Sequence, residues 1–105
     1  MPRWRSVWLL VLLIAGPAAA GQTPPLKIGM TAAISGPVSH LGQSMRAGIE
    51  SCFAEINAAG GINGRRLTLV VRDDAYDPAT AARNMQALIT EDHVLGIIGS
   101  VGTPT

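Results

Sequence analysis

Small polar residues near the end of the chain could bind an anion or a sugar. Residues 97–105, IIGSVGTPT, close an apolar run with a turn that contains Ser100, Gly102 and Thr103. Hydroxyl groups both donate and accept hydrogen bonds, and glycine lets backbone N–H groups come close to a ligand. This combination suits a carboxylate or a sugar hydroxyl, and an ordinary turn at the end of a strand explains the same residues equally well. The turn lacks G-x-G-x-x-G and the Gly-Lys-Ser/Thr of a P-loop, so we do not predict nucleotide binding.

Two neighbouring acids, Asp73 and Asp74, follow a second apolar run. Paired carboxylates at such a place can hold a divalent cation. Short acidic side chains in loops more often accept hydrogen bonds from nearby backbone N–H groups, and we favour that role here. His40, which we assign to a loop, and His93, which we assign to a helix end, lack the spacing of metal ligands. We therefore predict no metal site.

No set of residues in the sequence resembles a complete catalytic site. Ser35 and Ser39 have no obvious base near them in the pattern. An enzyme built on a doubly wound sheet would need a nucleotide fingerprint or an acid–base pair, and the sequence offers neither. We predict a protein that is not an enzyme, with no catalytic residues and no cofactor.

Three apolar runs alternate with two helical patterns along the chain. We predict strands at residues 26–31, 67–72 and 94–98, and helices at about residues 44–58 and 78–91. This β-α-β-α-β alternation predicts an α/β fold with a parallel sheet and right-handed crossovers, as in doubly wound proteins. Ligands bind such sheets outside the carboxyl ends of the strands, where loops 32–42, 73–77 and 99–105 would gather.

Each predicted helix has one apolar side. The stripe of the first helix consists of Met45, Ile49, Cys52, Phe53 and Ile56. Cys52 is therefore expected to pack in the core, and Arg46, Glu50 and Asn57 are expected on other faces. The first helix ends at Gly60 and Gly61, because glycine adopts the left-handed conformation without strain.

The second helix has a clear start signal. Asp77 can cap the first free N–H groups, and Pro78 suits the first helical position. The predicted buried stripe consists of Ala82, Met85, Leu88 and Ile89. The residues expected on the outside are Arg83, Asn84 and Gln86.

The first twenty residues have the three parts of a secretory signal peptide. Arg3 and Arg5 supply the charged start, Val7 to Ala15 is an apolar run too short to span a bilayer, and Ala18 to Ala20 supply small residues for cleavage. An uncleaved membrane anchor is the competing interpretation. We predict that residues 1–20 are removed after export, which leaves residues 21–105 as the mature segment.

Charge and aromatic content argue against nucleic-acid binding. Cleavage would remove two of the eight basic residues and leave six against seven acidic ones. No basic face remains for a phosphate backbone. Phe53 and Tyr76 would be the remaining aromatic residues, which is too few for a base-stacking platform. The one cysteine, Cys52, cannot form a disulfide within the chain.

Several motifs together resemble a known family. They are Ser35-Gly36-Pro37, Gly42, the run from Glu55 to Gly64 (EINAAGGING), the run from Asp73 to Pro78 (DDAYDP), and Ile98-Gly99. In this order and spacing they resemble the start of the periplasmic leucine/isoleucine/valine-binding proteins. These are the substrate-binding proteins of ABC importers for branched-chain amino acids.

The resemblance implies a type I periplasmic binding protein, in which two α/β lobes clamp a ligand between them. In that family the loop after the third strand binds the ligand's carboxylate through a hydroxyl and backbone N–H groups. The matching hydroxyl here belongs to Thr103, and Ser100, Gly102 and Thr105 lie in the same loop. Leu41 stands where branched-chain amino-acid binders often have an aromatic residue against the ligand. Some members join the second and third loops by a disulfide, and Tyr76 and Gly102 occupy those positions here.

The resemblance also implies partners and leaves alternatives open. It implies a monomer that binds an amino acid or a related small carboxylate and delivers it to an ABC permease in the membrane. A ligand-sensing receptor domain with the same fold and a truncated chain without function are the alternatives. Because family members are several hundred residues long, residues 21–105 would be the N-terminal part of the first lobe. We expect marginal stability, since three strands and two helices would leave one sheet face thinly covered.

Overall fold

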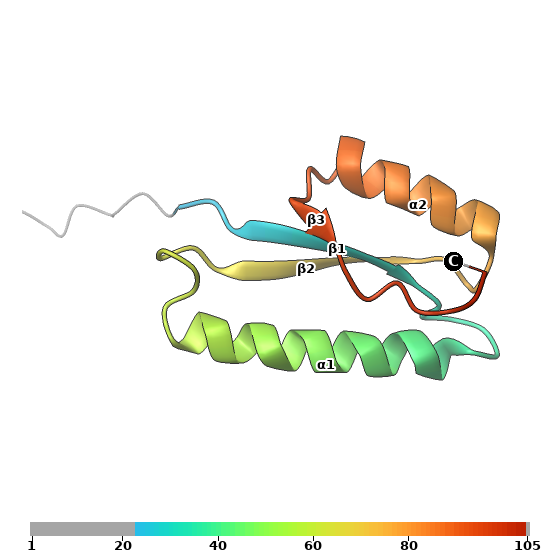
Figure 1. The fold of residues 1–105 in the computed structure, drawn as a ribbon, viewed down its shortest axis with the longest axis horizontal. Helices are drawn as coiled ribbons and strands as arrows, with labels where there is room; N and C mark the ends of the chain where they lie inside the picture. The colour runs from blue at the N-terminus through green and yellow to red at the C-terminus, as the bar shows by residue number, and fades with distance from the viewer. Residues whose placement is uncertain (1–22, 105) are drawn as a thin grey trace, which may run out of the picture.

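A three-stranded parallel sheet lies between two helices in the computed structural model, which describes residues 23–104 (Figure 1). The predicted signal peptide, residues 1–20, and Thr105 lie outside the described residues. The elements are β1 (Leu26–Ala32), α1 (Ser39–Ala58), β2 (Leu67–Asp73), α2 (Pro78–Thr90) and β3 (Gly96–Ile97). The predicted order of strands and helices is therefore confirmed. Within residues 23–104, no helix is long and apolar enough to cross a membrane.

The strands lie in the order β2-β1-β3, and both pairings are parallel. β1 pairs with β2 along its whole length, from Leu26 opposite Leu67 to Ala32 opposite Asp73. Figure 1 shows α1 and α2 on opposite faces of this sheet. Each face of the described sheet therefore carries one helix, as parallel sheets require. The expectation of a thinly covered face fits the α1 side, where an apolar groove between α1 and Ile98 is open and Ile98 is 43% exposed.

The third strand is shorter than predicted. Its regular part is Gly96–Ile97 rather than residues 94–98. The flanking residues still bond to β1, since Leu95 donates its N–H to the carbonyl oxygen of Lys27 at 2.8 Å and Ile98 donates to that of Gly29 at 2.9 Å. β3 therefore holds the third loop against the end of β1.

The first helix begins at Ser39, five residues before the predicted start. A hydrogen-bonded turn leads into the helix. The N–H of Ser39 donates to the carbonyl oxygen of Gly36 at 3.2 Å, and the N–H of Leu41 donates to that of Val38 at 3.0 Å. His40 and Leu41 are therefore helical, and their assignment to a loop is wrong. Gly42, which marks a loop in the sequence-based prediction, is instead a buried helical residue.

The apolar stripe of α1 is only partly covered. Ile49, Phe53 and Ile56 are half-buried, whereas Met45 is 38% exposed and Cys52 is exposed. The prediction that Cys52 packs in the core is therefore wrong. Cys52 instead lines an open apolar groove that α1 forms with Ile98.

Two polar residues lie closer to the sheet than predicted. Asn57 of α1 is half-buried, and its side chain bonds to both backbone groups of Leu67 at the start of β2. Asn84 of α2 is also half-buried and bonds to Thr31 and Asp73. The assignment of Asn84 to the outside is wrong, and Asn57, expected away from the apolar stripe, also contacts the sheet. A helix side that faces a sheet end meets unpaired backbone groups as well as apolar side chains.

The start of α2 is as predicted. Asp77 is the N-cap, with Oδ2 accepting the N–H of Thr80 at 2.7 Å, and Pro78 is the first helical residue. The buried side chains are Leu88, which is fully buried, and Ala81. The predicted stripe is correct at Leu88, but its other members, Ala82, Met85 and Ile89, are exposed.

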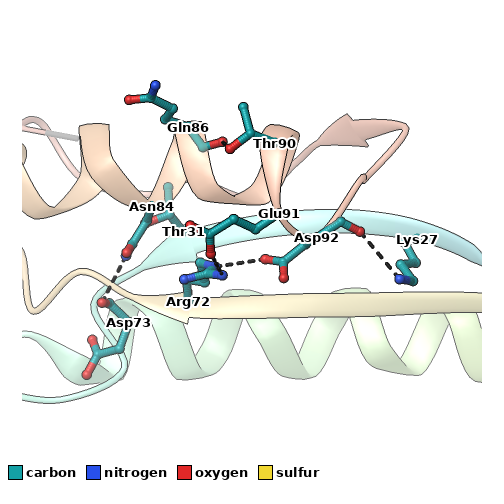
Figure 2. A network of polar contacts seen from close by, with 9 residues as sticks. All are labelled: Lys27, Thr31, Arg72, Asp73, Asn84, Gln86, Thr90, Glu91 and Asp92. Carbon is teal, nitrogen blue, oxygen red and sulfur yellow. Dashed lines mark hydrogen bonds and ion pairs between the residues drawn. The ribbon is translucent and has the colours of Figure 1, made fainter.

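A set of ion pairs holds the end of α2 to the sheet (Figure 2). Arg72 of β2 donates to Asp92 at 2.8 Å and to Glu91 at 3.2 Å. Lys27 of β1 donates to the carbonyl oxygen of Asp92 at 3.4 Å. The hydrogen bond from Arg72 lowers the pKa of Asp92. These contacts lie at the end of α2 remote from its N-cap.

Candidate functional site

Three loops gather at the carboxyl ends of the strands, as the topology predicts. The first loop (residues 33–38) leads from β1 to α1, the second loop (residues 74–77) leads from β2 to α2, and the third loop (residues 98–104) follows β3. Figure 1 shows all three at the same end of the sheet. The candidate site residues of the third loop therefore lie beside the loops that begin α1 and α2.

The carboxylate of Asp73 ties the first loop to the second. Its Oδ1 accepts the N–H groups of Ile34 at 2.8 Å, Ser35 at 3.2 Å and Ala75 at 2.9 Å. Its Oδ2 accepts a short hydrogen bond from the hydroxyl of Ser35. The prediction that these acids accept backbone N–H groups is confirmed for Asp73.

Asp74 is fully buried and joins β1 to the second loop. Its Oδ2 accepts the hydroxyl of Thr31 at 3.0 Å, and its Oδ1 accepts the N–H of Tyr76 at 2.9 Å. Asn84 extends this network by donating to Thr31 Oγ1 at 3.2 Å and to the carbonyl oxygen of Asp73 at 2.9 Å, a contact drawn in Figure 2. Sequence reasoning missed the roles of Thr31 and Asn84. A threonine in a strand and an asparagine in a helix do not by themselves indicate a hydrogen bond, and only the fold brings the two side chains together.

The acids of these loops are occupied by the chain's own donors. Among residues 23–104, no three His, Cys, Asp or Glu side chains lie together as a metal site would require. His40 lies in the first turn of α1, and His93 follows α2 with a φ of 55°. The second loop is therefore a structural junction rather than a group of free ligands.

Acid should weaken the Asp73 junction over a defined pH range. The hydrogen bond from the Ser35 hydroxyl, followed by those from the backbone N–H groups of Ile34, Ala75 and Ser35, lowers the pKa of Asp73 from 3.8 to about 2. Because the pKa is lowered in the folded state, the stabilisation is present above about pH 4 and is lost as the pH falls towards 2.

We expect the difference in thermal midpoint between the wild-type protein and the Asp73→Asn variant to be constant above pH 4 and to shrink from pH 4 to pH 2. Circular dichroism melts at several pH values would measure it. The Glu55→Ala variant, which lacks an exposed carboxylate of α1, is the matched control. A difference that does not change with pH would show that the Asp73 carboxylate does not stabilise the fold.

The third loop crosses the carboxyl end of the sheet from α1 towards α2. Gly99 has a φ of +74°, and a Cβ there would lie 2.5 Å from Ile49 Cδ1 of α1. At the other end of the loop, Pro104 lines a small cavity together with Thr31 and Pro78. Glycine therefore suits residue 99 chiefly because of its positive φ, since the Ile49 side chain could move aside from a Cβ.

The predicted ligand-binding residues fall into two groups. Leu41 and the third-loop residue Val101 line one apolar groove along α1, which also includes Met45, Ile49, Phe53 and Ile98. Ser100 and Thr103 are exposed, and Gly102 is half-buried with a φ of 131°. Neither hydroxyl lines the groove, and Thr105 lies outside the described residues. The structure thus brings Leu41 to the third loop, with the two hydroxyls on the loop's outer surface.

Comparison with known proteins agrees with this architecture. A family model described as periplasmic binding protein matches residues 25–105, which is most of the chain. The chain belongs to this family. The resemblance drawn from the motifs is thereby confirmed, and so is the α/β fold of a type I periplasmic binding protein lobe.

Individual relatives bear names of the same kind. The chain is 40% identical over 88 residues to Leu/Ile/Val-binding protein homolog 7 of Brucella melitensis biotype 1, covering 84% of this chain and 21% of that protein. It matches the crystal structure of a possible leucine/isoleucine/valine-binding protein from Rhodopirellula baltica SH 1 with a TM-score of 0.78 and 43% identity, covering 84% of this chain and 24% of that one. The chain thus spans about a fifth of the length of the curated relatives it matches.

One solved relative contains a ligand. The substrate-binding protein of the branched-chain amino acid transporter of Streptococcus pneumoniae was solved in complex with isoleucine. It matches this chain with a TM-score of 0.72 and 31% identity, covering 76% of this chain and 23% of that one. These relatives are named as binding proteins and not as enzymes.

Proposed function

We propose that this chain contributes the first part of a substrate-binding protein for an ABC importer of amino acids, with branched-chain amino acids as the expected ligands. The observation that carries the proposal is the fold shared with the isoleucine complex of the Streptococcus pneumoniae protein. The protein would bind its ligand and carry out no chemical reaction. Other small carboxylates are alternative ligands that suit the same site chemistry.

We assign the ligand's carboxylate to the third loop. The exposed hydroxyl of Thr103 is a donor of the kind that holds an anion, and Ser100, Gly102 and Thr105 lie in the same loop. Leu41, at the start of α1, would lie against the ligand's side chain. Its branched aliphatic side chain offers an apolar surface, which suits an apolar amino acid.

The proposed role has consequences for location and partners. Residues 1–20 would direct export and be removed, so that the protein works in the periplasm as a monomer. A second lobe, outside this chain, would close over the bound amino acid. The closed form would then be recognised by a permease in the membrane, which is a hinge mechanism.

Titration calorimetry of the full-length protein tests the proposal. We expect leucine, isoleucine or valine to bind, and the Thr103→Ala variant to bind about tenfold to a hundredfold more weakly, as for the loss of a hydrogen bond to a charged group. The Thr68→Ala variant is the matched control, because Thr68 is an exposed threonine near the start of β2, at the opposite end of the sheet.

Two results would count against this assignment. If none of a panel of amino acids binds to the wild-type protein, the proposed function is wrong. If Thr103→Ala and Thr68→Ala bind equally well, the carboxylate is held elsewhere.

A further inference from the structure

Four donors from two loops converge on the side chain of Asp73. They are the N–H groups of Ile34, Ser35 and Ala75 and the hydroxyl of Ser35. We call these four groups the donor nest. Convergent backbone N–H groups are the usual means by which a protein loop holds an anion. Here the anion is a carboxylate of the chain itself, so the nest is already filled.

The donor nest is connected to the start of α1. The N–H of Ile34 donates to Asp73, and its carbonyl oxygen accepts the side-chain amide of Gln43 at 3.1 Å. Gln43 lies in α1, two residues after Leu41. Ile34 is thus held from both sides, by β2 through Asp73 and by α1 through Gln43. Removing the Asp73 carboxylate would release one of these two attachments.

The charge on Asp73 makes the attachment strong. Hydrogen bonds to an ionised acceptor are roughly twice as strong as those between neutral groups. An aspartate side chain is ionised at neutral pH, and the lowered pKa of Asp73 reflects how the donors around it favour the ionised form. A neutral side chain that fills the same space would hold the first loop less firmly.

We propose that Asp73 is a positioning residue for ligand binding, whose carboxylate fills the donor nest and fixes the first loop and Leu41 relative to the third loop. This inference rests on the proposed function, since it assumes that Leu41 and the third loop bind a ligand. Asp73 itself does not touch the ligand. Because its carboxylate occupies the N–H groups of Ile34 and Ser35, the ligand's carboxylate is left to the third loop.

Chemical rescue in the full-length protein tests this role. The Asp73→Ala variant removes the carboxylate and leaves the donor nest empty. We expect it to bind isoleucine about tenfold more weakly, the equivalent of one lost hydrogen bond. Sodium formate supplies a free carboxylate and should partly restore both isoleucine affinity and thermal midpoint, whereas sodium chloride at equal concentration should not.

A second variant covers the case in which Asp73→Ala folds poorly. The Asp73→Asn side chain keeps the size of aspartate and still fills the nest with its amide. We expect intermediate affinity without any specific response to formate. The Glu55→Ala variant, which lacks an exposed carboxylate on α1, should bind isoleucine as the wild type does and should not respond to formate.

The outcomes separate this inference from the function on which it rests. If Asp73→Ala binds isoleucine as tightly as the wild type while Thr103→Ala does not, the positioning role is wrong and the proposed function stands. If formate acts no better than chloride on Asp73→Ala, the donor nest does not take a carboxylate and the inference is overturned. A wild-type protein that binds no amino acid would overturn the proposed function and the positioning role together.

Discussion

Gly42→Ala should lower the free energy of unfolding by about 3 kcal/mol, at the upper end of the usual cost of overpacking. A Cβ on Gly42 would lie 2.0 Å from the carbonyl oxygen of Ala33 and 2.7 Å from its carbonyl carbon. Both are backbone atoms just after β1, so no side chain can move aside to make room. The first turn of α1 would have to shift away from the sheet.

Gly48→Ala is the matched control, because it makes the same chemical change in the same helix. A Cβ on Gly48 meets nothing within 4 Å. Alanine is favoured over glycine within a helix by about 0.8–1.0 kcal/mol, so we expect this variant to be slightly more stable than the wild type. Urea denaturation of the two variants would measure the difference. Equal stabilities would show that α1 does not pack on the backbone at Gly42.

A different control separates stability from binding, because Gly48 lines the same groove as Leu41. The shift that Gly42→Ala forces on α1 acts directly next to Leu41, whereas Glu55 is an exposed residue near the other end of the helix. We therefore expect isoleucine affinity to fall in Gly42→Ala and to stay unchanged in Glu55→Ala. This comparison would connect the packing of the first turn to the proposed ligand site.

The sequence predicted the order of strands and helices along the chain, the parallel sheet, and the edge of the sheet at which the loops meet. These features follow from the alternation of strands and helices and from start signals such as Asp77-Pro78, which act locally. The start of α1 was predicted too late because glycine is common in loops and also occurs where a helix packs closely on a neighbouring backbone. Gly42 looks like a loop residue in the sequence, but in the fold it allows the helix to touch the backbone of Ala33.

The apolar stripes were less informative than the start signals. Cys52 and Ile89 continue the apolar periodicity of their helices but are exposed in the described residues. Periodicity shows which side of a helix is apolar, and the neighbouring elements decide how much of that side is buried. The polar contacts of Asn57 and Asn84 were missed for a related reason. Each amide bonds to groups far away in the sequence, and only the register of the sheet brings them together.

Asn57→Ala should lower the free energy of unfolding by about 2 kcal/mol, because two partly buried backbone groups lose their partner. The side-chain Oδ1 of Asn57 accepts the N–H of Leu67 at 2.7 Å, and its Nδ2 donates to the carbonyl oxygen of Leu67 at 2.9 Å. Leu67 is only 8% exposed. Water therefore has little access to replace the lost bonds.

The loss of the Asn57 side chain should have a local effect on the backbone groups of Leu67. Leu67 pairs with Leu26 in the register of β1 and β2, and Leu26 donates its N–H to the carbonyl oxygen of Arg66. In a parallel ladder the N–H and C=O of one residue point to the same side, so the backbone groups of Leu67 point away from β1 and towards the edge that Asn57 covers. Asn57 thus joins the last turn of α1 to the first residue of β2.

Hydrogen exchange should detect the loss of this junction directly. We expect the amide of Leu67 to lose more protection in Asn57→Ala than the amide of Ile28 in β1, whose protection should fall only by the loss in global free energy of unfolding. Glu55→Ala, an exposed change in the same turn of α1, should leave both amides unchanged. If Leu67 exchanges at the same rate in both variants, Asn57 does not hold the start of β2. The register of β2 would then be set by its pairing with β1 alone.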